Sequence, residues 1–162
     1  MKNIEPKLKD ALRLVANGVF VVSAEHQGQV RGFTATWVSQ VSYEHPLVMV
    51  SVSKDHDTYP LITGSRRFVV NILGARQREI ATHFGRKKAD MSTVDSSYFR
   101  EEGGRRMPVL RDALAYLICD VVSVLEVEDH TIFVGKAADA AVQPDESPLL
   151  YWPRKGYVTA VE

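Results

Sequence analysis

The chain has 162 residues, of which 45% are hydrophobic and 25% are charged; this composition excludes an intrinsically disordered chain and fits one folded domain. Its 20 Lys and Arg residues balance its 20 Asp and Glu residues, so no general field of one sign attracts nucleic acid or anionic lipid. A single cysteine excludes an internal disulfide framework and a cysteine-based metal cluster, and no stretch approaches the roughly 20 apolar residues that span a bilayer. We therefore expect one domain over residues 1–162, cytoplasmic, with no nucleic acid and no membrane among its partners.

A short helix and two strands are predicted first. Apolar residues recur at helical spacing over residues 8–15, which predicts an amphipathic helix that ends at Asn17-Gly18, where either residue suits a left-handed cap. Residues 18–22 are β-branched and aromatic, and a second β-rich stretch covers residues 29–41. Because the turn-like residues 25–28 separate these stretches, we predict two paired strands.

Two apolar runs follow. Residues 47–52 (LVMVSV) are nearly all apolar and of strand length, which predicts a strand covered on both faces. Residues 68–73 repeat this texture after a predicted helical turn over residues 58–64. Residues 75–84 predict a short helix with one apolar face, closed by Gly85.

A polar segment then precedes two long strands. Residues 86–107 are charged and weakly periodic, which predicts a long surface excursion with one helical turn at residues 96–99. Residues 113–127 and 131–142 predict two long strands joined through residues 128–130.

Short closing segments at residues 148–151 and 157–161 complete the predicted fold. About seven strands, a few short peripheral helices and no alternation of strand with helix favour a mainly β protein built as an antiparallel barrel. Neither a GxGxxG nor a GxxxxGK[ST] motif is present, which excludes the usual nucleotide-binding loops as the source of a cofactor site.

Three segments carry a family resemblance when they are read together. They are GVFVVSAEHQGQVRGFTATWVSQVSYEHPLVMVSV, FVVNILGARQREIATHF and DHTIFVGKA, in this order over residues 10–157. In order and spacing they resemble the flavin reductase family, which uses an FMN-binding split β-barrel. The resemblance implies a homodimer that binds FMN or FAD near the dimer interface, reduces it with NADH or NADPH, and often supplies a partner monooxygenase.

The first candidate site is a strand segment of small and hydroxylated residues. An isoalloxazine ring needs hydroxyl or backbone groups at its polar edge and apolar contact on its face. The resemblance implies that this segment supplies them through Thr34, Ala35, Thr36 and Trp37. The alternative is that threonine simply favours strands.

The second candidate site is the end of the apolar strand at residues 47–52 and the helical turn after it. A helix start, with free N–H groups and a positive dipole end, suits a phosphate. The family commonly has serine and threonine at the positions of His56 and Thr58, so His56 departs from the pattern and could make phosphate binding depend on pH. The alternative for Thr58 is a helix N-cap. The implied cofactor-binding residues here are Ser51, Val52, Ser53, Lys54, His56 and Thr58.

The third candidate site is a cluster of cations after the helix at residues 75–84. Arginine can donate two parallel hydrogen bonds to phosphate oxygens, whereas lysine contributes a point charge. By resemblance, Arg86 and Lys87 clamp the flavin phosphate together with His83, Phe84 and Gly85. The alternative is a solvated charged loop.

Asp129-His130 joins the two long strands, and the resemblance implies that His130 lies close to the nicotinamide on the open face of the flavin. Hydride transfer needs no protein acid; the protein must hold nicotinamide C4 and flavin N5 roughly 3–3.5 Å apart and exclude water. His130 is therefore the candidate catalytic residue, with a positioning role. A structural or solvent-exposed histidine is the alternative.

Two further residues complete the predicted flavin site. Asn71 lies beside the ring or the phosphate chain, or else serves the backbone of the barrel itself. Tyr151 resembles part of the family's closing aromatic element, which covers the ring or the dimer seam. No metal spacing is present. Two other functions stay open: a flavin-holding electron carrier or sensor on the same barrel, and an enzyme that uses bound flavin on an organic substrate.

Overall fold

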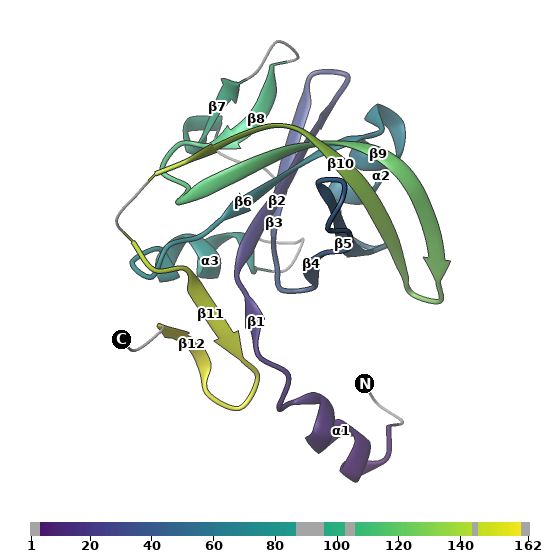
Figure 1. Ribbon diagram of the computed structural model, residues 1–162, viewed down its shortest axis with the longest axis vertical. Helices are drawn as coiled ribbons and strands as arrows, with labels where there is room; N and C mark the ends of the chain where they lie inside the picture. The colour runs from purple at the N-terminus through teal and green to yellow at the C-terminus, as the bar shows by residue number, and fades with distance from the viewer. Residues whose placement is uncertain (1–3, 87–95, 103–105, 144–145, 160–162) are drawn as a thin grey trace.

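Antiparallel strands form most of the structure. The computed structural model describes residues 4–86, 96–102, 106–143 and 146–159. Within these ranges, one sheet of seven strands in the order β3-β2-β6-β9-β10-β5-β4 curls into an incomplete barrel (Figure 1). Its strands are β2 (Phe20–His26), β3 (Gln29–Ala35), β4 (Val38–Gln40), β5 (Leu47–Ser53), β6 (Arg67–Ile72), β9 (Ala115–Val127) and β10 (His130–Val142). The predicted mainly β split barrel is confirmed.

Smaller elements surround this sheet. The strands β1 (Asn17–Gly18), β11 (Leu149–Trp152) and β12 (Gly156–Thr159) form a three-stranded sheet, and β7 (Phe99–Glu102) pairs with β8 (Met107–Leu110). The helices are α1 (Pro6–Leu12), α2 (Thr58–Ser65) and α3 (Arg78–Phe84), with a 3-10 turn at Ser96–Tyr98. None of the helices in the described ranges has the length and apolar character needed to cross a membrane.

Side chains that alternate along the strands fill the interior of the barrel. In β5, Val48, Val50 and Val52 are buried, whereas the residues between them are only partly buried. The prediction that this strand is covered on both faces is therefore wrong, because an antiparallel sheet can leave one face to solvent. Cys119 of β9 lies in the same core, and burial raises the pKa of its thiol to about 12.

The first helix is shorter than predicted. It ends at Leu12, and Asn17 and Gly18 lie instead in β1, where they pair with Tyr151 and Leu150 of β11. Strand pairing across the chain therefore overrides the local signal for a helix cap. No residue of α1 is buried, and Figure 1 shows the helix below the barrel, outside its body.

The segment after α3 holds more regular structure than predicted. Gly85 ends α3 as expected, although with a right-handed backbone (φ −86°) rather than the left-handed cap. Within the predicted surface excursion, the β7–β8 hairpin was missed because charged residues hide its alternation. Its residues Phe99 and Met107 are nevertheless buried.

Two hairpins were predicted correctly. Gln27 and Gly28 both have positive φ angles (52° and 78°), which gives the tight turn between β2 and β3 the right-handed twist of its strands. The long strands β9 and β10 pair from their turn to their far ends, with two register shifts. The turn end of this hairpin projects from the barrel in Figure 1, and it exposes Leu125 and Val127.

Asn71 of β6 ties three strands together inside the protein. Its side-chain amide donates to the carbonyl oxygen of Val21 (2.8 Å) and to Ser23 Oγ (3.0 Å), and its Oδ1 accepts from the backbone N–H of Leu110 (2.8 Å). Its side chain is fully buried. The sequence left open whether Asn71 contacts the flavin or the backbone of the barrel; in the structure its side chain bonds to the backbone of the barrel and to Ser23.

Replacing Asn71 tests this network. We expect Asn71→Ala to lower the free energy of unfolding by about 1–3 kcal/mol or more, because it leaves buried donors and acceptors without partners. Urea denaturation measures the change. The exposed Gln29→Ala is the control and should stay within about 0.5 kcal/mol of the parent chain. Equal stability of Asn71→Ala and the control would contradict a structural role.

Candidate functional site

Strand β5 organises the candidate site through its outer face. Because Val50 and Val52 point into the core, Ser51 and Ser53 point to the opposite face. Ser53 pairs with His130 of β10, and the backbone N–H of Ser51 donates to the carbonyl oxygen of Trp37 (3.0 Å). These pairings bring residues from three separate segments onto one face.

Trp37 and His130 meet on this face. Their ring centroids are 5.1 Å apart, with the planes tilted by 50°. The indole is 55% exposed, so it forms an accessible aromatic surface beside the imidazole. The structure thus joins two residues that the sequence placed in different candidate sites.

Asp129 fixes the His130 ring. Its Oδ1 lies 2.7 Å from His130 Nδ1, and this hydrogen bond lowers the pKa of the carboxyl group. Since a carboxylate only accepts, the shared hydrogen belongs to Nδ1, and Nε2 is the ring nitrogen left for a ligand. The side chain of His130 is 25% exposed against 88% for Asp129, so the acid holds the ring from the solvent side.

Lys54 lies in an ion pair at the end of β5. Its Nζ is 2.5 Å from Glu126 Oε2, and Thr131 Oγ1 donates to the other carboxylate oxygen of Glu126 (3.2 Å). The hydrogen bond between Lys54 and Glu126 raises the pKa of the lysine and lowers the pKa of the acid. Lys54 would have to leave this pair, at least in part, to bind a phosphate.

The sequence reasoning missed Glu126. The hairpin turn after β9 was predicted, and it places Glu126 directly opposite Thr131. Pairing the residues on either side of the predicted turn one by one could therefore have placed the Glu126 carboxylate near Thr131 from the sequence.

The start of α2 differs in detail from the prediction. The N-cap of α2 is Asp57, so the alternative role of Thr58 as N-cap is wrong. Thr58 is itself buried at 1% exposure, and the ring of His56 stacks on Phe33 (4.4 Å between centroids, 24° between planes). The ring of His56 therefore lies against β3, and its expected contact with a phosphate stays a prediction.

Helix α3 is held against β3 by the hydroxyl of Thr34, which donates to the carbonyl oxygen of Ala81 (2.7 Å). Phe84 is buried and His83 stacks on Tyr98 (4.7 Å between centroids). The exposed residues at the end of the helix are Gly85 and Arg86. Lys87 lies outside the described residues.

Several predicted site residues have side chains turned into the protein. Ala35 and Val52 belong to the barrel core, and Asn71 and Phe84 are buried as described above. These residues can offer a ligand their backbone groups but not their side chains. Thr36 is partly buried between β3 and β4, and Tyr151 packs edge-on against Tyr157 beside a second core cluster.

Comparison with known proteins gives a consistent result. A family model described as "Flavin reductase like domain" matches residues 12–160. The chain is 34% identical over 148 residues to NADH-dependent flavin reductase StyB of Pseudomonas fluorescens, covering 89% of this chain and 84% of the relative. It is also 34% identical over 150 residues to the reductase component of 4-hydroxyphenylacetate 3-monooxygenase from Thermus thermophilus, covering 92% of each.

Solved structures agree with these sequence matches. The NADH:FAD oxidoreductase SgcE6 of Streptomyces globisporus C-1027, solved in complex with NAD and FAD fragments, superimposes with a TM-score of 0.83. It is 28% identical, and the alignment covers 99% of this chain and 98% of that one.

Proposed function

The chain belongs to the flavin reductase like domain family, and we propose that its two cofactors meet on the outer face of β4, β5 and β10. It is an oxidoreductase that reduces a flavin with a nicotinamide. The observation that supports this proposal most is the contact between Trp37 and His130 beside Ser51 and Ser53. Flat rings need an apolar surface with a few polar groups at its edge, and this face combines both. When bound, the flavin supplies the chemistry, because it accepts the hydride of the nicotinamide.

His130 positions the nicotinamide in this proposal. Asp129 holds Nδ1, so Nε2 faces the ligand with a fixed ring orientation. Trp37 lies directly beside the His130 ring, so its exposed indole adds apolar surface to the same side of the proposed site and helps to exclude water. The protein thus contributes alignment rather than acid or base catalysis.

Arg86, together with Lys87, binds the phosphate of the flavin. Arg86 and Gly85 are exposed at the end of α3, and Thr34 anchors this helix to β3, so the guanidinium is held beside this strand. A guanidinium suits a phosphate because it can donate two parallel hydrogen bonds. Lys54 is less suited, since it is already paired with Glu126.

The chain acts as a homodimer in the cytoplasm and supplies reduced flavin to a partner monooxygenase. Relatives named as reductase components of monooxygenases support the partner. Exposed apolar side chains at the turn end of the β9–β10 hairpin, among them Leu125 and Val127, support self-association. The single, buried cysteine suits a reducing compartment.

An assay of the purified protein tests the proposed function. We expect it to oxidise NADH or NADPH when FMN or FAD is added, with the decrease in nicotinamide absorbance as the measurement. Tight stoichiometric flavin with negligible nicotinamide oxidation would indicate an electron carrier or sensor instead. Turnover that required an organic substrate would indicate a flavin-dependent enzyme of another kind.

Arg86→Ala tests the phosphate site. We expect the flavin dissociation constant to rise at least several-fold, because a hydrogen bond to a charged group contributes about 1.5–3 kcal/mol. Titration of flavin fluorescence measures it. Arg76→Ala removes another exposed cation, near the start of α3, and is the matched control. The same dissociation constant for both variants would remove Arg86 from the site.

His130→Ala tests the position of the nicotinamide. We expect KM for the nicotinamide to rise more than the flavin dissociation constant, since His130 lies on the nicotinamide side of the proposed site. Steady-state kinetics and flavin titration give the two values. His45→Ala, which removes an exposed histidine elsewhere, should change neither. A larger effect on flavin than on nicotinamide would reverse the assignment.

A further inference from the structure

Helix α1 presents an apolar stripe that its own chain leaves uncovered. Leu8, Ala11, Leu12 and Val15 follow the i, i+3, i+4, i+7 spacing of one helix face, and the three larger side chains are 54–55% exposed. The 3-10-like hydrogen bond from the N–H of Val15 to the carbonyl oxygen of Leu12 (3.2 Å) extends the helical path to the end of the stripe.

A helix of this length needs a packing partner. Helices shorter than about 12–15 residues are marginal in water on their own. Helix α1 has seven residues, no side-chain hydrogen bond at its N-cap and no buried residue. Within the described residues, Arg154 donates to the carbonyl oxygen of Asp10 (3.4 Å), but no apolar surface buries the helix, so an apolar partner would add the stability that α1 lacks.

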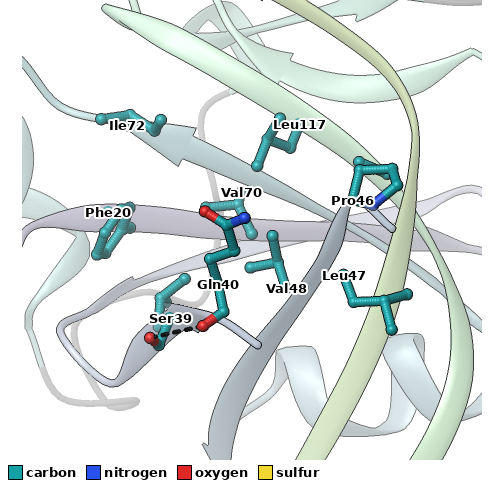
Figure 2. A pocket seen from close by; sticks show the side chains of 11 residues that line it. Phe20, Ser39, Gln40, Pro46, Leu47, Val48, Val70, Ile72 and Leu117 are labelled. Carbon is teal, nitrogen blue, oxygen red and sulfur yellow. Dashed lines mark hydrogen bonds between the residues drawn. The ribbon is translucent and has the colours of Figure 1, made fainter. Parts of the chain in front are cut away.

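The barrel has an apolar hollow at one end of its interior, which we call the barrel-mouth groove. It has a volume of about 530 Å³, and Figure 2 shows Phe20, Leu47, Val70, Ile72 and Leu117 around it. Most of these residues continue the inward-facing series of β2, β6 and β9, whereas Leu47 stands beside the inward-facing Val48 of β5. The hollow lies where these side chains do not fill the interior. The side chains that line it include no charged group.

Gln40 extends this groove. It lines both the large hollow and a second hollow of about 300 Å³ that it forms with Val41, Ser42 and Tyr43. Val41 and Tyr43 are exposed, so the apolar surface continues from the barrel mouth across Gln40 onto the following loop. A continuous groove of this kind suits the apolar face of a helix.

The charges beside the two surfaces also correspond. Lys7 and Lys9 flank the apolar stripe of α1. The exposed acids Glu44 and Asp139 lie two residues from the groove residues Pro46 and Ala137, and they outnumber the one cation next to Ala137, Lys136. Cations on the helix and acids beside the groove favour a single partner and orientation.

We propose that α1 of one copy docks in the barrel-mouth groove of a second copy, and that α1 of the second copy docks in the groove of the first. One chain carries both surfaces, so a two-fold arrangement covers both helices and both grooves. The inference rests on the homodimer proposed above and names the segments that form it. Because β4 lines the groove and begins one residue after Trp37, docking of α1 also braces the strand that follows the candidate site.

Disulfide trapping between two differently tagged chains tests this contact. One chain carries Gln40→Cys, and its co-expressed partner carries Leu8→Cys or Leu12→Cys. The native Cys119 is buried, which keeps it out of the reaction. A disulfide forms only when the two Cα atoms come within about 7 Å. We expect mild oxidation to join the two tags in a band of doubled mass on a non-reducing gel, with at least one of the helix positions.

Asp10→Cys in place of the leucine variants is the control, because Asp10 lies on the opposite face of α1. It should give no band that joins the tags. Equal trapping through Asp10, or a link between two helices, would overturn the proposal. So would dimers in sedimentation without any link to Gln40, a result that leaves the homodimer standing. Monomers alone would overturn the docking and the homodimer together, while the nicotinamide oxidation assay still decides the enzymatic function.

Discussion

The alternation of side chains along β5 is the constraint on which the rest of the site depends. Val48, Val50 and Val52 must face the core to fill the barrel, and this fixes Ser51 and Ser53 on the opposite face. Strand pairing then adds β4 and β10 on either side, so Trp37 and His130 reach the same face. A shift of β5 by one residue would bury the serines and expose the valines, destroying the core and the site at once.

The electrostatics of the site come from the turn end of one hairpin. Asp129 holds the ring of His130, and Glu126 holds Lys54, so both acids come from the β9–β10 hairpin. The two pairs have different consequences. Asp129 holds Nδ1 of the imidazole and leaves Nε2 as the nitrogen for a ligand, whereas Glu126 occupies the ammonium group of Lys54. The proposed phosphate site therefore relies on Arg86 rather than on Lys54.

The sequence predicted the barrel well because its strongest signals are local. The tight turn at Gln27-Gly28, the long hairpin and the apolar runs each have a pattern that neighbouring residues complete. Failures occurred where a distant segment decides the outcome. The local sequence of Asn17 and Gly18 predicts a helix cap, but pairing with the distant strand β11 makes them a strand. In the β7–β8 hairpin, charged residues hide the alternation that would have predicted its strands. Likewise, Trp37 and His130 are far apart in sequence, and only the sheet brings them together.

A family motif that lies on a strand contains both core residues and surface residues. For this reason, only some of the predicted flavin-contact residues have side chains that a ligand could reach. Successive residues of a strand point to opposite faces, so about half of any such motif must serve the core. Thr34 and Ala35 show this in β3, and Ser51 and Val52 show it in β5: the first of each pair is turned away from the core, and the second is buried in it. In the proposed site, ligand specificity would therefore depend on the outward residues, while the inward ones set their positions.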